Sequence, residues 1–247
     1  MRLARSLVAL FLLVPVAASA QPTERTLSPL EVQVACGPPT SFAVPSEALH
    51  VIGSQDPVAR FVFSTGELLV LDGGLGRGVS LGQQYFIRRP IIAGVERSKP
   101  SSIQTLGWLS VVAVNDKTAI ARVDHFCDAI TSGDYLEPFT APSVPAVAER
   151  DDPSGELDFS TLGRIVAGPE NMNSGGTGSL MLIEPGENAS LQPGARFAVY
   201  RDLHKPGLPL ASVGEGVVVS VGKSMVLTRI TRSRDAIVTG DYVVPRK

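Results

Sequence analysis

Few side chains in this sequence have the types and spacing that catalysis or metal binding requires. A nucleophilic site needs a serine or cysteine beside a histidine and an acid, but the chain has only His50, His125 and His204 and no Gly-x-Ser-x-Gly elbow. No His/Cys/Asp/Glu cluster has the spacing of a metal site. We therefore predict that the protein is not an enzyme and that it binds no metal or cofactor.

A glycine-rich run at residues 73–78 invites a phosphate-loop interpretation. A phosphate cradle requires a following helix N-terminus and a lysine–serine pair, and the run is followed instead by a predicted strand. We interpret it as a glycine-rich hairpin loop.

The start of the chain has the features of a secretory signal peptide. Two arginines, Arg2 and Arg5, precede an apolar run over residues 7–16, and small residues follow up to Ala20. We expect residues 1–20 to be removed, and the run is shorter than the roughly 20 apolar residues that cross a bilayer. A periplasmic or secreted protein without a transmembrane segment in its mature chain is predicted.

The charge balance limits the partners of such a chain. The full sequence has 22 basic and 24 acidic residues, and residues 1–20 hold two of the basic ones, which leaves 20 against 24 in the mature part. A mildly acidic surface argues against nucleic acid or anionic lipid as a partner, since both require clustered Lys and Arg.

The chain has two cysteines, Cys36 and Cys127. Because an exported chain meets an oxidising compartment, we predict that they form a disulfide. The alternative is a catalytic thiol, but no Cys-x-x-Cys motif accompanies either residue.

An internal repeat is the clearest pattern in the sequence. Residues 128–135 (DAITSGDY) match residues 235–242 (DAIVTGDY) at six of eight positions, with an offset of 107. Upstream the offset becomes 112, which places a five-residue insertion in the first copy between Arg89 and Leu106. A period above 100 residues indicates a duplicated domain and not a solenoid.

The predicted organisation follows from this repeat. After the signal peptide (1–20) come an N-terminal extension (21–47) that begins with a low-order stretch over residues 21–32, a first β-domain (48–138), a linker (139–161) rich in proline and charge, and a second β-domain (162–247).

Each copy has the pattern of a small all-β domain. Short β-branched runs alternate with glycine and proline, and no window of 12 or more residues has helical periodicity. In the second copy, strands are predicted near residues 164–167, 180–183, 196–200, 215–221, 224–230 and 242–244, with a two-residue type II′ turn at Gly222-Lys223. The first copy offers the same set of strands, with Asn115-Asp116 at the equivalent turn. Six short strands cannot bury themselves as a flat sheet, so we predict two tandem SH3-like small β-barrels related by duplication.

The repeated Ile-x-x-Gly-Asp-Tyr motif is interpreted as structural. The isoleucine would enter the core, the glycine would supply a turn, the aspartate (Asp134 or Asp241) would accept bonds from nearby backbone amides, and the tyrosine would begin the closing strand. A metal role for the aspartates is the alternative, but neither has a neighbouring ligand in sequence.

The second copy carries a likeness to a known family. Its residues 191–201 (LQPGARFAVYR), 214–216 (GEG), 228–230 (TRI) and 240–245 (GDYVVP) resemble the C-terminal β-domain that follows LysM modules in bacterial envelope proteins. They are also similar to the C-terminal domain of flagellar assembly protein T. The resemblance implies a periplasmic barrel module that engages the cell wall or another envelope protein, and it transfers no binding residue.

Four residues are candidates for partner binding. Arg229, Arg232 and Arg234 form a locally basic segment that would suit an acidic partner, and Trp108 is the chain's single tryptophan. The simpler interpretation is that the arginines point outward from a strand. We expect a non-enzymatic envelope binding or scaffolding protein that contacts another envelope protein, with peptidoglycan or glycan binding as the alternative.

Overall fold

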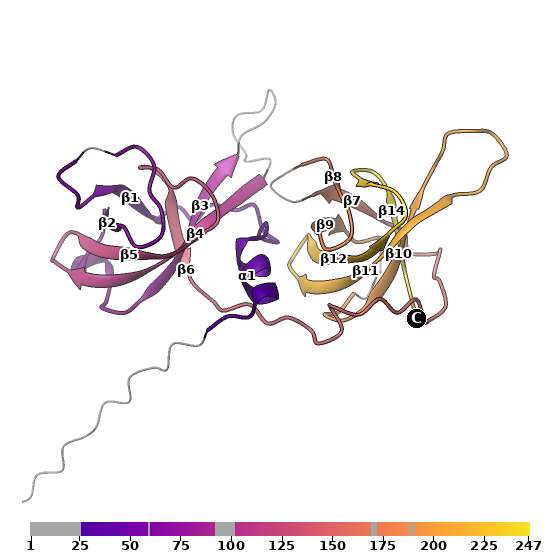
Figure 1. Cartoon of the computed structure of the whole chain (residues 1–247), viewed down its shortest axis with the longest axis horizontal. Coiled ribbons are helices and arrows are strands. Elements are labelled where there is room, and N and C mark those ends of the chain that lie inside the picture. Colours follow the sequence, from indigo (N-terminus) through magenta and orange to yellow (C-terminus); the bar gives the residue numbers. More distant parts are fainter. Residues whose placement is uncertain (1–25, 59, 92–101, 169–171, 188, 190) are drawn as a thin grey trace, which may run out of the picture.

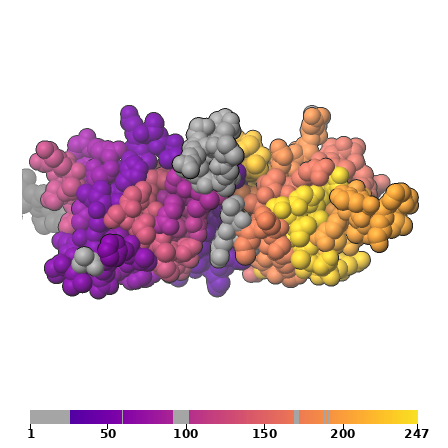
Figure 2. Space-filling view, turned by 90° about the horizontal axis from the view of Figure 1, so that it is seen from above, coloured from indigo at the N-terminus to yellow at the C-terminus, as the bar shows by residue number. Residues whose placement is uncertain are grey.

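A computed structural model describes residues 26–58, 60–91, 102–168, 172–187, 189 and 191–247. The predicted signal peptide and its cleavage point after Ala20 lie outside these residues, as does most of the predicted insertion between Arg89 and Leu106. The described chain folds into two β-barrels that lie side by side, with a short helix between them (Figure 1). In the space-filling view they form the two halves of an elongated body (Figure 2).

The first barrel contains six antiparallel strands in the closed order β1-β2-β5-β4-β3-β6. Their bounds are β1 Leu49–Ser54, β2 Leu68–Leu71, β3 Gln84–Ile91, β4 Ser102–Val114, β5 Ala119–Phe126 and β6 Tyr135–Pro138, with a 3-10 turn at Leu75–Arg77. The predicted glycine-rich loop contains that turn, but its interpretation as a hairpin loop is wrong, because the flanking strands β2 and β3 do not pair with each other: β2 pairs with β1 and β5, and β3 with β4 and β6.

The second barrel has the closed order β10-β11-β12-β9-β7-β14. Its strands are β7 Gly163–Ala167, β9 Leu180–Glu184, β10 Arg196–Arg201, β11 Ala211–Val221, β12 Val226–Ser233 and β14 Tyr242–Pro245. A separate two-stranded sheet joins β8 (Ser174–Gly175) to β13 (Ile237–Val238). The six barrel strands fall where the sequence predicts them, whereas β8 and β13 were not predicted. This agreement confirms the all-β architecture of two small barrels.

The two barrels share their irregularities as well as their strand order. In both, the register between the third and fourth strands shifts at one aligned place, after Ile87 in the first barrel and after Val199 in the second. The fourth and fifth strands also shift at aligned places, after Trp108 and after Glu215. Because β-bulges are specific features of a strand pair, their recurrence supports a duplicated domain.

Each barrel encloses its own apolar core. The first core includes Val51, Phe63, Leu69, Ile87, Leu106, Leu109 and Ile130, and the second includes Ile165, Met181, Phe197, Val199, Val218, Ile230 and Ile237. Closing the sheet leaves no long unpaired strand edge, which removes the exposure that a flat six-stranded sheet would have.

A helix forms where the sequence was expected to be of low order. Helix α1 spans Pro29–Cys36 and starts in a capping box in which the Ser28 side chain accepts from the Glu31 amide and Glu31 accepts from the Ser28 amide. The expectation that residues 21–32 are of low order is therefore wrong from Pro29 onward. The run Ser28-Pro29-Leu30-Glu31 has the sequence of a capping box with proline at the first helical position, which is typical of a helix N-terminus. No helix in the described part of the chain is long and apolar enough to cross a bilayer.

Helix α1 packs against both barrels. Ala35 lies in a cluster with Phe86 and Trp108 of the first barrel, and Val34 packs on a cluster of the second barrel that contains Leu180, Leu182, Val219 and Leu227. The Gln33 side chain donates to the Gly178 carbonyl at 2.9 Å. The helix thus joins the two barrels into one body.

The segment between the barrels is bound to the second barrel. The Ala148 side chain is fully buried, Arg196 donates to the Arg150 carbonyl, and Leu157 forms a β-bridge with Arg246. The predicted linker, residues 139–161, is therefore held on the surface of the second barrel, and we refer to it as the strap.

The two predicted hairpin turns are displaced by one residue. Gly222 donates its amide to the Met225 carbonyl, so Lys223 and Ser224 occupy the turn, and Asn115 bonds to Thr118 in the same way. The prediction of a Gly222-Lys223 type II′ turn is wrong, since Gly222 does not have a positive φ. A glycine stands there for another reason: a Cβ would collide with Thr40 of the N-terminal extension.

Candidate functional site

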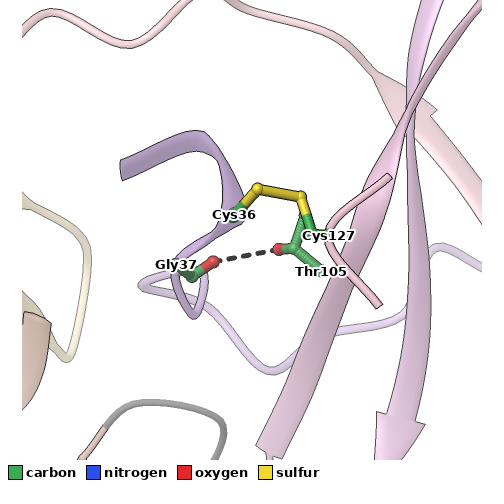
Figure 3. The surroundings of a disulfide bond; sticks show 4 residues. All are labelled: Cys36, Gly37, Thr105 and Cys127. Carbon is green, nitrogen blue, oxygen red and sulfur yellow. Dashed lines mark hydrogen bonds between the residues drawn. A yellow bond between two sulfur atoms is a disulfide. The ribbon is translucent and has the colours of Figure 1, made fainter. Parts of the chain in front are cut away.

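The disulfide between Cys36 and Cys127 ties α1 to the first barrel. Its S–S distance is 2.00 Å and its Cα–Cα distance 5.6 Å, and it joins the last residue of α1 to the segment that follows β5 (Figure 3). The Thr105 hydroxyl donates to the Gly37 carbonyl at 3.0 Å beside it. The predicted pairing is confirmed, and it fixes the helix that contacts both barrels.

A cleft of about 210 Å³ opens beside the disulfide and has walls from both barrels. The first barrel and the extension contribute Cys36, Pro38, Ile91, Ser102, Ile103, Gln104, Thr105, Cys127 and Asp128, and the second contributes Ala167, Gly168 and Leu182. The Ser102 hydroxyl is buried and has no hydrogen-bond partner in the described chain. The cleft therefore gives small solutes a route to the disulfide.

Trp108 and His125 form a stacked pair next to the disulfide. They are cross-strand partners on β4 and β5, and their ring centroids lie 4.4 Å apart with planes 15° from parallel. Trp108 is 8% exposed and packs against Ala35, Phe86 and Phe139. The tryptophan is thus a packing residue under α1 and presents no open aromatic platform.

His125 also lies close to both sulfur atoms. One ring nitrogen of His125 and the two cysteine sulfurs all lie within 4.8 Å of one another, and all three residues are half-buried. Spacing in the sequence could not reveal this cluster because Cys36 and Cys127 are 91 residues apart. It is the one group of three such ligands that the described residues contain.

Two of the three candidate arginines bind the chain's own strap. Arg229 donates to the Ala148 carbonyl at 3.0 Å, and Arg232 approaches Asp151 at 3.4 Å. Arg234 is exposed. Arg229 and Arg232 do point outward from β12, as the simpler interpretation held, whereas Arg234 follows the last residue of that strand, Ser233.

The repeated motif builds a buried ion pair in the first barrel. Asp134 accepts from Arg89 through Nε and Nη2, each at 2.7 Å, and from the Thr131 amide at 2.7 Å. Its side chain is 3% exposed. The hydrogen bond to Asp134 raises the pKa of the Arg89 guanidinium, so the arginine stays charged. Ile130 enters the core and Gly133 has a positive φ of 95°, as the motif predicts.

The second barrel repeats this arrangement with one addition. Arg201 donates to Asp241 through Nε and Nη2 at 2.8 Å, and Asp241 accepts from the Val238 amide. Arg201 also contacts the more exposed Asp235 at 3.0 Å. The offset of 112 aligns Arg89 with Arg201, but neither ion pair was predicted from the sequence. An arginine and an aspartate recur at matching positions in both copies, and this recurrence could have suggested the two pairs. Each pair holds a loop against its barrel.

An exposed loop of the first barrel carries apolar side chains. This loop, residues 55–64 between β1 and β2, presents Val58, Phe61 and Val62, and Phe61 is 86% exposed. Two residues after Phe61, Phe63 is 1% exposed and forms a β-bridge with Ile130. This contact anchors the loop to the core. We refer to the described residues 55–58 and 60–64 as the apolar loop.

The charges of the apolar loop are paired within the molecule. Arg60 contacts Glu67 at 2.6 Å and Asp56 at 3.2 Å, and Asp56 also accepts from the Val58 amide. What the loop offers to the solvent is therefore mainly apolar.

The other two histidines have ordinary structural neighbours. His50 contacts Asp72 at 3.3 Å at the start of β1, and His204 contacts Asp202 at 3.2 Å in an exposed loop. Neither lies in a cluster of three His, Cys or carboxylate ligands within the described chain.

The fold and these contacts define a duplicated small-barrel protein whose two barrels are joined by a disulfide-tethered helix. A scan against models of known protein families finds no match, and a search of curated proteins finds no relative.

Proposed function

We propose that this chain is an exported, non-enzymatic binding or scaffolding protein of the cell envelope, and that its first barrel contacts another envelope protein through the apolar loop. The observation that carries this proposal is the exposure of Phe61 beside the anchored Phe63. Exposed aromatic side chains on a fixed backbone are typical of contact sites between proteins.

The charge pattern favours an apolar protein surface as the partner. Arg60 is paired with both Asp56 and Glu67, which leaves one net negative charge, so the loop presents no positive charge to attract an anionic lipid or a nucleic acid. The contacts of α1 with both barrels further support a scaffolding function, because two barrels in a fixed arrangement would hold their binding partners at a set separation.

Peptidoglycan or glycan binding is the second candidate. Sugar rings bind on exposed aromatic faces, and Phe61 offers one, whereas Trp108 lies beneath α1. A single aromatic side chain among aliphatic neighbours suits a protein surface better than a polar glycan chain.

Site-specific cross-linking tests the proposal. A photo-reactive phenylalanine analogue replaces Phe61 in the cells that make the protein, and a matched chain carries it at Leu208, an exposed residue between β10 and β11 of the second barrel. We expect a discrete protein adduct from position 61 that Val62→Asp abolishes and that position 208 does not give. Equal patterns from the two positions would overturn the proposal.

Co-sedimentation with purified sacculi separates the two candidates. The oxidised mature chain is mixed with sacculi across a salt series, with Phe61→Ser as the test variant and Leu208→Ser as its control. Binding that survives moderate salt and requires Phe61 would replace the protein partner with the cell wall. N-terminal sequencing of the exported protein checks for cleavage after Ala20.

A further inference from the structure

We propose that Cys36, Cys127 and His125 form a binding site for one thiophilic d10 cation, Zn(II) or Cu(I), when the disulfide is reduced. In the oxidised protein the two sulfurs are bonded to each other. In the reduced protein the same three side chains supply two thiolates and one imidazole, which is a ligand set that these ions prefer.

The geometry of the cluster agrees with such a site. In a tetrahedral zinc site, Zn–S bonds of about 2.3 Å and Zn–N bonds of about 2.0 Å place neighbouring ligand atoms roughly 3.5–3.8 Å apart. The two sulfurs and the His125 nitrogen lie within 4.8 Å of one another. Small side-chain rotations after the S–S bond opens are therefore enough to surround an ion, with water completing the coordination.

The surroundings of His125 suit a metal ligand. Its ring is held by the stack on Trp108, and no residue of the described chain hydrogen-bonds to either ring nitrogen. The imidazole is therefore oriented but has a free nitrogen to offer. Because the cleft between the barrels is lined by Cys36 and Cys127, an ion has a path to the sulfurs.

Reduction by a dithiol would generate the site. One thiolate of the reductant attacks a sulfur of the disulfide and forms a mixed disulfide, and the second thiolate closes the reductant's own disulfide. Two electrons and two protons pass to the protein, which gains two thiols. On binding the cation these thiols release their protons to water.

This site would keep α1 in place in either redox state. Cys36 is the last residue of α1, and α1 contacts both barrels. A disulfide joins the helix to the first barrel in the oxidised protein, and a shared metal ion would join it in the reduced one.

The test uses the mature chain, reduced and then freed of reductant without oxygen. Zn(II) is added in competition with a chromogenic chelator, and Cu(I) is added in a parallel experiment with a Cu(I)-specific chelator. Fluorescence of Trp108, the single tryptophan, reports binding at the ring stacked on it. We expect saturation at one equivalent in the reduced protein and no such binding in the oxidised protein.

Two histidine variants test whether His125 is a ligand of the bound ion. His125→Phe retains an aromatic ring to stack on Trp108 but has no ligand atom, and we expect it to bind at least about 10-fold more weakly. His204→Asn is the control, because His204 has a φ of 53° that asparagine tolerates and lies in an exposed loop. Wild-type affinity in His125→Phe, or no stoichiometric binding of either ion by the reduced wild type, would overturn the proposal.

Discussion

Replacing Asp134 by asparagine should lower the stability of the first barrel far more than the same substitution at an exposed, ion-paired aspartate lowers the stability of its barrel. Asp134 is almost fully buried and accepts four hydrogen bonds, two from Arg89, one from the Thr131 amide and a longer one of 3.5 Å from the Thr131 hydroxyl. Asparagine keeps one acceptor oxygen and turns an NH2 group toward donors of Arg89 or Thr131, of which Arg89 Nη2 also donates to the Ala129 carbonyl and the Thr131 hydroxyl. The equivalent substitution in the second barrel is Asp241→Asn.

The magnitude follows from these contacts. Breaking a buried ion pair costs about 3–5 kcal/mol, and the Arg89 side chain is 32% exposed, so water compensates part of the loss. We expect about 3 kcal/mol, at the lower end of that range. With a urea dependence of about 1.5 kcal/mol per molar for one small barrel, the unfolding midpoint would fall by about 2 M.

Urea unfolding with two probes measures the effect. Fluorescence of Trp108 reports the first barrel because it is the only tryptophan, whereas far-ultraviolet circular dichroism reports the strands of both barrels. Asp134→Asn should lower the fluorescence midpoint, and Asp241→Asn should lower the dichroism midpoint. If Asp241→Asn also lowers the fluorescence midpoint, α1 couples the two barrels in unfolding.

A matched control lies at the arginine of the second barrel. Asp235 contacts Arg201 at 3.0 Å, but its side chain is 65% exposed, so Asp235→Asn should cost no more than about 1 kcal/mol. If Asp134→Asn and Asp241→Asn cost as little as Asp235→Asn, the buried pairs do not stabilise the loops and the reasoning is refuted.

Three further predictions concern the disulfide, a buried tyrosine and a glycine. Cys127→Ser opens a loop of 91 residues, and the chain-entropy model gives a loss of about 4.5 kcal/mol, to be measured as a lower urea midpoint than that of the oxidised protein; an unchanged midpoint would contradict it. Burial raises the pKa of Tyr135 to about 12, so the contribution of its neutral phenol to the free energy of unfolding is complete below pH 10 and is lost as the pH rises to 12, on the order of 3 kcal/mol. Tyr135→Phe should flatten this alkaline decline, and an equally steep decline in the variant would refute the assignment. Gly107→Ala should cost more than about 2 kcal/mol, because its φ is 147° and a Cβ would collide with the His125 carbonyl, whereas Gly66→Ala meets no atom and should cost about 1 kcal/mol; equal losses in thermal unfolding would be inconsistent with the collision.

Local chemistry accounts for what could be predicted from the sequence alone. The run Ile130 to Tyr135 predicted a core residue, a left-handed glycine and an aspartate that caps its own turn, and the bond of that aspartate to the Thr131 amide spans three residues along the chain. The disulfide could be predicted as well, because two cysteines in a chain expected to be exported leave one pairing. Strand positions followed from patterns over three to seven residues.

The duplication and the barrels could likewise be recognised from the residues alone. Repetition at an offset of 107 residues indicated two domains, and six short strands per copy required closure. The capping box at Ser28 and Glu31 was equally local, and the helix it begins was missed although its signal was present.

Contacts between distant segments were decided by the tertiary structure. Arg229 meets Ala148 because the strap folds back on β12, and His125 meets Cys36 because α1 docks beside β5. Gly222 is required by Thr40 and not by its turn. Such contacts depend on where closed barrels and a helix come to rest, and a residue type at one position carries no information about a partner 80 or more residues away. A sequence pattern therefore predicted the elements, and only their packing produced the site.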